Sequence, residues 1–446
     1  MQPGAASSLF RSQPALHLLA VLWGLLLLWW DPIGLSSASE QALADFYLSS
    51  SAGIYPDERR TSTAVILTTD SDLESLGITW PVSHRHHDQF LYAIGRAKPK
   101  SVFVDVFFLD DRVPTEAVRL QERLRWLSCQ TALYLMVPPD EARTGLSNSW
   151  AQFYSSSSEV VGECSIRLVN SSASTIDQSY AYPSTAPNAG LRSPAEQVFF
   201  DFGPNEDINL EPWHDTRAWQ ITWSLPSKRS CDKIASSHLL SEKSSDACET
   251  LERNLIVRAG RHILNAVSGD RFPHLKNDLS IQDVSPVPIY GVAELANRNS
   301  SAFSALRDSH VVYAVNVVGA EDTVEAPVYQ AGQSRAIPAG LAHAMAIDNL
   351  FAYQGIPKGY LRSPQLKYIF GAAAILLGAA LFSILSATIS WRRRIMLLSL
   401  LVSVAMLVPL NLVYGELFRL AAINWISIPL VYFAAMSSLA PIFRKA

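Results

Sequence analysis

The chain has 446 residues, of which 49% are hydrophobic and only 17% are charged. This composition is too apolar for an ordinary soluble enzyme and predicts a protein that lies partly inside a membrane. The formal net charge of −4 implies no basic surface, which argues against nucleic acid as a partner.

The first predicted element is an apolar run over residues 14–30, which follows a short stretch at residues 1–13. At about 1.5 Å per residue the run is just long enough to cross a bilayer, and its paired tryptophans favour an uncleaved anchor. The alternative is a cleaved signal peptide, because residues 37–39 are small enough for a peptidase site. Both interpretations send the following domain outward, beginning with a juxtamembrane helix and linker over residues 40–56.

Residues 64–111 predict a strand, a helix and a second strand, which together form the first βαβ unit of a parallel sheet. Residues 64–68 are rich in β-branched side chains, as in a buried strand. Ser83 is expected to cap the helix that follows. Four side chains at helical spacing form its inward stripe: His87, Phe90, Leu91 and Ile94. The second strand covers residues 101–108, where Asp105 interrupts a run that is apolar on both faces.

A helix over residues 114–127 and a strand over residues 132–137 continue this alternation. The order and the short connections predict an α/β fold, a doubly wound, mostly parallel sheet with helices on both faces. Residues 310–317 predict a fourth strand, and residues 341–353 a helix. The pattern is weaker over residues 141–282. Three predictions fall there: strands over 197–202 and 216–223, and a helix over 251–267.

Three further apolar runs are long enough to span a membrane: residues 368–389, 395–414 and 420–443. Arg392, Arg393 and Arg394 follow the first of them, and basic residues follow the last. By the positive-inside rule, the triple arginine and the C-terminus lie in the cytoplasm. The large domain, residues 40–364, is therefore predicted to be periplasmic, with residues 1–13 in the cytoplasm.

All four cysteines fall in the domain that is predicted to lie outside the membrane: Cys129, Cys164, Cys231 and Cys248. In an oxidising compartment they can form two disulfides, with three connectivities. A bridge between Cys231 and Cys248 is favoured, because both lie in a polar, loop-like stretch. Buried free thiols are the alternative.

Acidic side chains fall at or just past the carboxyl ends of the predicted strands, where parallel sheets usually bind ligands. They are Asp70, Asp105, Asp110, Asp140 and Asp322. If they converge, they form a site for a cation or a cationic ligand. The alternative is that each caps a helix or accepts hydrogen bonds from loop amides. His84 and His87 share one helix face without a third ligand at zinc spacing, so no metal site is predicted.

Several motifs occur in a fixed order: DSDLESLG followed by WP at residues 70–81, a helix with a histidine near its start, AKPKSVFVDVFF at 97–108, VVGAED at 317–322 and PAGLAHAMAIDNL at 338–350. Their order resembles the CHASE type 2 family of extracytoplasmic sensor domains, over about residues 67–350. The resemblance implies one membrane helix before the domain and about three after it. It also adds His87 and His343 to the candidate ligand-binding residues, with a structural role as the alternative for each.

No phosphate-binding loop, nucleophile elbow or zinc-protease motif occurs, so no catalytic residue or cofactor is expected. We predict a multi-pass sensor of the bacterial inner membrane whose periplasmic domain binds an unknown ligand. Because only the arginine loop and a short tail face the cytoplasm, the signal is expected to pass through the membrane helices to a separate cytoplasmic or membrane partner. Membrane lipid and a second copy of the chain are further candidate partners. The alternatives are a non-signalling envelope scaffold or assembly protein and a periplasmic enzyme.

Overall fold

The computed structural model describes ten stretches of the chain, which all fall within one compact unit, Leu48–Pro357. They are residues 59–138, 142–157, 164–170, 181–183, 191–204, 218–220, 287–296, 300–318, 323–327 and 334–355. No helix in these stretches is long and apolar enough to cross a membrane. The four predicted spans and the helices predicted at residues 40–56 and 251–267 lie outside them.

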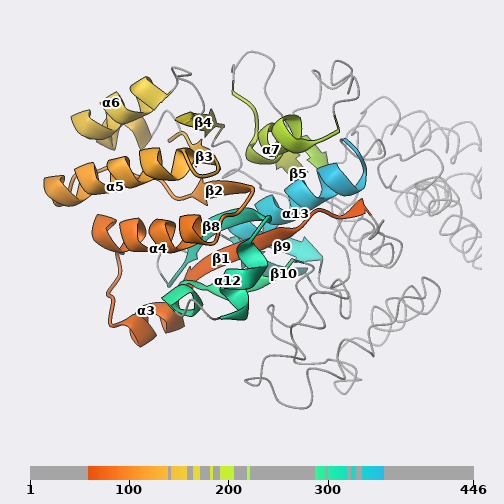
Figure 1. The fold of residues 1–446 in the computed structure, drawn as a ribbon, viewed down its shortest axis with the longest axis horizontal. Coiled ribbons are helices and arrows are strands. Elements are labelled where there is room, and N and C mark those ends of the chain that lie inside the picture. The colour runs from red at the N-terminus through yellow and green to blue at the C-terminus, as the bar shows by residue number, and fades with distance from the viewer. Residues whose placement is uncertain are drawn as a thin grey trace, which may run out of the picture. The chain divides into compact units, whose positions relative to one another are not determined.

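Six parallel strands form one sheet, in the order β4-β3-β2-β8-β1-β7 (Figure 1). They are β1 Thr63–Thr69, β2 Ser101–Asp105, β3 Ala132–Met136, β4 Ile166–Val169, β7 Ile289–Gly291 and β8 His310–Asn316. The predicted parallel α/β fold is confirmed. The strands predicted at residues 64–68, 132–137 and 310–317 are found within one residue of their expected ends.

The centre of the sheet is β8, which comes from a segment far along the chain. Its first residue, His310, pairs with Thr63 of β1 on one side and with Ser101 of β2 on the other. Ser101 and His310 are 209 residues apart, and their side chains are hydrogen bonded at 2.7 Å. The βαβ unit predicted at residues 64–111 is therefore a crossover that passes over one strand.

The helices of four crossover connections lie on one face of the sheet. The connections from β1 to β2, β2 to β3, β3 to β4 and β7 to β8 all move in the same direction across the sheet. Because such connections are right-handed, their helices must lie on the same side. These elements are α3 Asp70–Leu76, α4 His84–Arg96, α5 Pro114–Ser128, the short 3-10 turn Ala142–Gly145, α6 Asn148–Ser157, the 3-10 turn Val292–Ala296 and α12 Ser301–Leu306.

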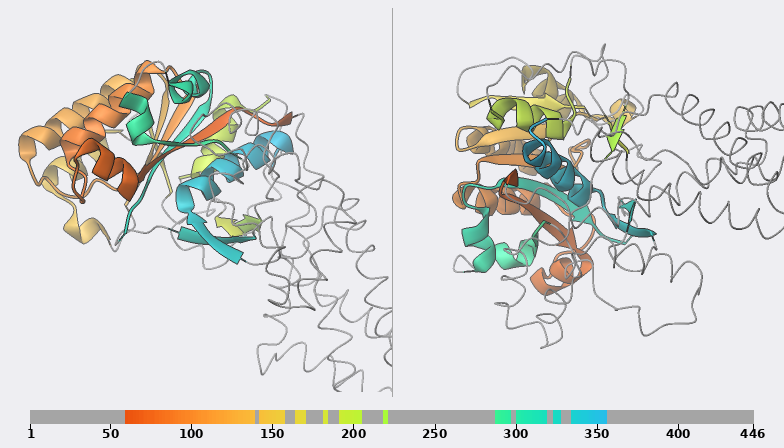
Figure 2. Two further views of the ribbon diagram at one scale, coloured as in Figure 1. Left: turned by 90° about the horizontal axis from the view of Figure 1, so that it is seen from below. Right: turned by 90° about the vertical axis from the view of Figure 1, so that its right-hand side faces the viewer.

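The opposite face is covered by α7 (Pro194–Phe202) and α13 (Ala339–Ala352), and Figure 2 shows α13 across the sheet from α4 and α5. α7 belongs to the segment that carries the chain back from β4 to β7. The Tyr134 hydroxyl on β3 donates to Asp201 of this helix. Helices on both faces are thus confirmed: on the second face, α7 lies in the return connection from β4 to β7, and α13 follows the last strand of the sheet. Two antiparallel strand pairs complete the described elements: β5 Ala181–Pro183 with β6 Ala218–Gln220, and the hairpin of β9 Thr323–Pro327 with β10 Ser334–Pro338.

The strand predicted at residues 197–202 is wrong, because these residues belong to the helix α7. The run QVFFDF has the aromatic and β-branched content of a strand. Ser193 and Pro194 precede it, however, and proline at the first helical position fixes a backbone angle that suits a helix. Of the strand predicted at residues 216–223, the structure describes β6.

The predicted inward stripe of α4 is confirmed, since all four of its members are buried. α4 packs closely on α5 at Gly95, where a Cβ atom would lie only 2.7 Å from the ring of Trp126. On the same helix, the buried carboxylate of Asp88 forms ion pairs with Arg119 and Arg123 of α5 at 2.9 and 2.6 Å. Contacts between these two helices therefore combine close apolar packing with a buried charge.

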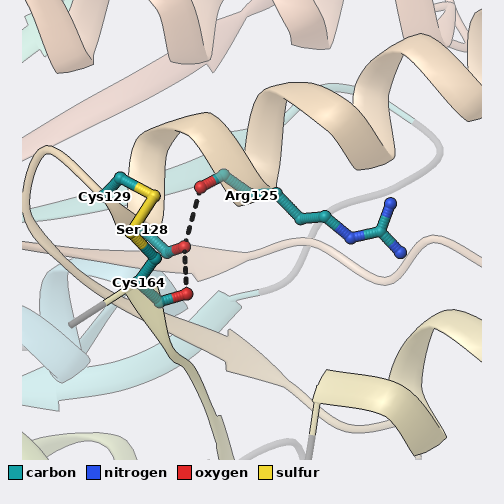
Figure 3. The surroundings of a disulfide bond; sticks show 4 residues. All are labelled: Arg125, Ser128, Cys129 and Cys164. Carbon is teal, nitrogen blue, oxygen red and sulfur yellow. Dashed lines mark hydrogen bonds between the residues drawn. A yellow bond between two sulfur atoms is a disulfide. The ribbon is translucent and has the colours of Figure 1, made fainter. Parts of the chain in front are cut away.

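Cys129 and Cys164 form a disulfide, which connects the end of α5 to the segment that enters β4 (Figure 3). The hydroxyl of Ser128 is hydrogen bonded to the backbone oxygens of Arg125 and Cys164, each at 2.8 Å. The bridge joins residues 35 apart in the chain. Cys231 and Cys248, the pair favoured from the sequence, lie outside the described residues.

Removing this disulfide by the double substitution Cys129→Ala and Cys164→Ala is expected to lower the free energy of unfolding by about 2 to 4 kcal/mol. The reason is that the unfolded chain without the disulfide has a higher conformational entropy. Denaturant unfolding of the full chain in detergent measures the loss. Ser128→Ala keeps the covalent bond and should cost only about 1 kcal/mol. Equal unfolding midpoints for the double variant and the wild type would contradict the prediction.

Candidate functional site

Two acids of the first motif hold loop amides at the carboxyl edge of the sheet. Asp70 is exposed, and its Oδ2 accepts a hydrogen bond from the backbone N–H of Val318, just past β8, at 3.0 Å. Asp72, which the sequence did not single out, is buried. Its Oδ2 accepts from the N–H and the hydroxyl of Thr69 at 3.1 and 2.6 Å, and its Oδ1 accepts from the N–H of Ala293, past β7, at 3.3 Å. The two acids thus connect the segments that leave β7, β1 and β8.

Asp105 and His343 lie together on the face of the sheet that α13 covers. Asp105 is the last residue of β2, so the strand predicted at residues 101–108 ends there and is not interrupted by the acid. His343 Nε2 lies 3.8 Å from Asp105 Oδ1, and the two side chains are only 3% and 5% exposed. Burial lowers the pKa of His343 from 6.5 to about 3, so its imidazole is neutral at neutral pH. The pair is therefore a close polar contact between a carboxyl group and a neutral ring.

The close approach of α13 to this edge depends on Gly340, in the first turn of the helix. A Cβ atom at this position would lie 2.5 Å from the Cβ of Ala314 on β8 and 3.7 Å from Asp105 Oδ2. Without a side chain at Gly340, the N-terminal turn of α13 comes next to Asp105. The dipole of a helix favours negative charge at this end.

Gly340→Ala is expected to lower the free energy of unfolding by about 1 to 3 kcal/mol, because the added methyl group overlaps an atom fixed to the backbone of β8. Thermal or denaturant unfolding of the full chain in detergent measures the change. Gly145→Ala is the control, since nothing lies within 4 Å of a Cβ atom there. The prediction fails if the two variants unfold at the same midpoint.

Asn316 ends β8 on the same face as Asp105. The register of β2 and β8 pairs Asp105 with Ala314, and Asn316 lies two residues farther along, so its side chain points to the same side. Its side-chain oxygen Oδ1 is buried and accepts no hydrogen bond from the residues that the structure describes. Buried polar atoms are usually hydrogen bonded, so this acceptor can serve a bound donor.

His87 belongs to α4 and lies on the other face of the sheet. Its Nδ1 is hydrogen bonded to the hydroxyl of Tyr313 at 2.7 Å, and its ring packs edge-on against Phe108. Burial lowers the pKa of His87 from 6.5 to about 3. His84, one turn earlier, packs edge-on against Phe108 and Trp150. Both histidines are thus part of an aromatic core, separated by the sheet from the polar pair beside α13.

Asp110 lies in the segment after β2 and does not join Asp105. Its carboxylate pairs with Arg112 at 2.9 Å, and both side chains are about half exposed. Asp140 and Asp322 lie outside the described residues. Within the described part of the chain, no group of three or more His, Cys, Asp or Glu side chains could hold a metal ion. Of the ligand candidates, the structure therefore brings together Asp105 and His343, and Asn316 ends the neighbouring strand on the same face.

The fold is an open, parallel α/β sheet, a class in which ligands usually lie beyond the carboxyl ends of the strands. The chain belongs to the CHASE2 domain family, whose model matches residues 18–385. The resemblance found in the sequence motifs is thereby confirmed. CHASE2 is a family of extracytoplasmic sensor domains and not a family of enzymes.

The matched region extends beyond the described domain on both sides. It begins within the apolar run at residues 14–30 and ends within the run at residues 368–389. The family match therefore includes hydrophobic sequence before and after the sheet. No curated protein and no solved structure matches the chain.

Proposed function

We propose that the chain is a multi-pass sensor of the bacterial inner membrane whose periplasmic CHASE2 domain binds a small cationic ligand. The sensory role and the extracytoplasmic location follow the family. The ligand chemistry rests on one observation: Asp105 and the Oδ1 atom of Asn316, which accepts nothing from the described residues, are buried at the same edge. Both groups accept hydrogen bonds, and an organic ammonium group supplies both the donors and the opposite charge.

His343 is compatible with such a ligand because its ring is neutral and brings no competing positive charge. Its edge-on contact with Phe103, at 5.0 Å between ring centroids, holds the imidazole against the sheet. Asp70 and Asp110 already hold a backbone amide and an arginine, so we assign them structural roles. The site is thus centred on the face that α13 covers.

Thermal unfolding of the full chain in detergent tests the binding step, with methylammonium and putrescine as amine probes. A probe at about one hundred times its Kd should stabilise the wild type by about 2.7 kcal/mol. Asn316→Leu and Asp105→Asn should lose this response. Asp110→Asn is the matched control, since it removes a half-exposed carboxylate from the same edge and should keep the response. If neither amine raises the Tm of the wild type, or if Asp105→Asn keeps the shift, the proposed ligand chemistry is wrong.

Four membrane spans are proposed, at residues 14–30, 368–389, 395–414 and 420–443, and the apolar ends of the family match support the first two. Arg392, Arg393 and Arg394 place the first C-terminal loop in the cytoplasm. Alkaline phosphatase fused after residue 364 should be active, and fused after the last residue it should be inactive. An active C-terminal fusion would contradict this orientation.

The signal is proposed to pass through these spans to a separate cytoplasmic or membrane partner. A ligand can shift the packing of the spans only by its difference in affinity for the two arrangements. Crosslinking in cells with and without putrescine separates this role from scaffolding. A partner captured equally under both conditions, from a protein whose Tm does not respond, would favour the scaffold.

A further inference from the structure

α13 runs from the carboxyl edge of the sheet, where the strands end, to the amino edge, where they begin. Near its start, His343 lies beside Asp105, the last residue of β2. At its end, the ring of Phe351 stacks on His310, the first residue of β8, with 5.1 Å between centroids. The helix therefore runs antiparallel to the strands, from the carboxyl edge that holds the candidate ligand site to the amino edge (Figure 1).

A buried ion pair holds the far end of this helix. Asp348 Oδ2 lies 2.9 Å from the Nε atom of Arg60, and the two side chains are only 1% and 10% exposed. Arg60 lies just before β1, in the segment through which the chain enters the sheet. The backbone oxygen of Ser62 in the same segment accepts from the N–H of His310 at 2.7 Å. The segment just before β1 is thus joined both to β8 and to α13, the last helix that the structure describes.

Between its two ends α13 is enclosed. Every residue of the helix except Phe351 is buried. Asn349 donates from its side chain to the backbone oxygen of Met345 at 2.8 Å, so this polar group is satisfied within the helix. A helix packed on all sides in a dense interior shifts as a unit, because its neighbours leave no room for local bending. A displacement of the first turn should therefore reach the last turn.

We propose that α13 is the transmission element of the sensor: binding at Asp105 and Asn316 displaces its first turn, and this displacement changes the Arg60–Asp348 ion pair at its other end. The inference deepens the proposed function and depends on it for the meaning of the signal. The ion pair is well placed for this role in the sequence. Arg60 follows the proposed span at residues 14–30, and Asp348 precedes the one at residues 368–389.

The mechanical coupling can be measured without a ligand, by hydrogen–deuterium exchange of the full chain in detergent. Gly340→Ala inserts a methyl group between the first turn of α13 and β8. The readout is the amide of Tyr353, which donates to the oxygen of Asn349 at 2.9 Å, and that of His310. Both amides should exchange at least about tenfold faster than in the wild type, relative to amides of β3.

Gly95→Ala is the matched control, because it inserts the same methyl group between α4 and α5 on the opposite face. It should leave the exchange of Tyr353 and His310 unchanged relative to β3. Faster exchange confined to residues 341–344, or the same acceleration in both variants, would overturn the proposal. If Gly340→Ala does not fold, Asp105→Asn perturbs the same turn and takes the same readout.

The outcome is separable from that of the binding experiment. Coupling without any amine-induced change in Tm would sustain the role of α13 and overturn the proposed ligand. An amine response without coupling would sustain the ligand site and overturn the role of α13. Arg60→Met completes the test, since coupling is reciprocal and this change should alter the amine affinity by about fivefold or more.

Discussion

Acidification is expected to destabilise the domain by on the order of 4 kcal/mol for each pH unit below about pH 6. Three buried histidines contribute most, since burial lowers the pKa of His87 and His343 from 6.5 to about 3 and that of His310 to about 4. In the unfolded chain these side chains take up protons near pH 6.5, and the folded chain does not. Their contribution is fully present above pH 6.5 and is lost as the pH falls, toward about 4 for His310 and about 3 for His87 and His343, at about 1.4 kcal/mol per unit for each histidine.

Urea unfolding of the full chain in detergent at about pH 7.5, 6.5 and 5.5 measures this slope. His310→Asn is the informative variant, because it keeps a polar side chain beside Ser101 and removes one of the three titrating rings. Its slope should be smaller by about one third. A free energy of unfolding that stays constant down to about pH 5 would show that these rings are not buried in their neutral form.

Asp88→Ala is expected to cost about 3 to 5 kcal/mol, the range for breaking a buried ion pair by removing one partner. Asp88 is 1% exposed, and its carboxylate is the shared partner of Arg119 and Arg123. The guanidinium of Arg123 also lies over the rings of Tyr92 and Trp126, which hold it in place once its partner is gone. The charge is then left partly desolvated between α4 and α5.

Arg119→Met is the matched control for this prediction. The Arg119 side chain is 63% exposed, so its ion pair with Asp88 contributes about 1 kcal/mol or less to the free energy of unfolding. Denaturant unfolding of both variants in the same detergent gives the comparison. If Asp88→Ala and Arg119→Met lower the free energy of unfolding equally, the buried ion pair between Asp88 and Arg123 contributes little and the prediction is wrong.

Local patterns in the sequence predicted the first half of the sheet well. The residues of β1, α4, β2, α5 and β3 carry the periodicity of their elements, and Ser83 and Pro114 mark where helices begin. The α7 prediction failed because the run QVFFDF satisfies a strand pattern, while the deciding signal, Ser193 followed by Pro194, lies outside the run. The place of β8 between β1 and β2 has no local signal, since it depends on packing between segments 209 residues apart.

The candidate site was predicted only in part. Asp105 and His343 were both singled out, and they meet because β2 ends where α13 begins. Asn316 was missed, since an amide at the end of an apolar strand resembles an ordinary turn residue. Asp72 did have a signal, because Thr69 and Asp72 are spaced as a capping box. The buried ion pairs of Asp88 had no signal in the sequence, because its partners Arg119 and Arg123 come from another helix.

The central position of β8 has a consequence for biogenesis. β1 has no neighbour among β2, β3 and β4, so it stays unpaired until residues 289–316 have emerged from the ribosome. Contacts of such long sequence separation form slowly, and unpaired strand edges are prone to aggregation meanwhile. The six-stranded sheet is therefore expected to form only after residues 289–316 have been synthesised.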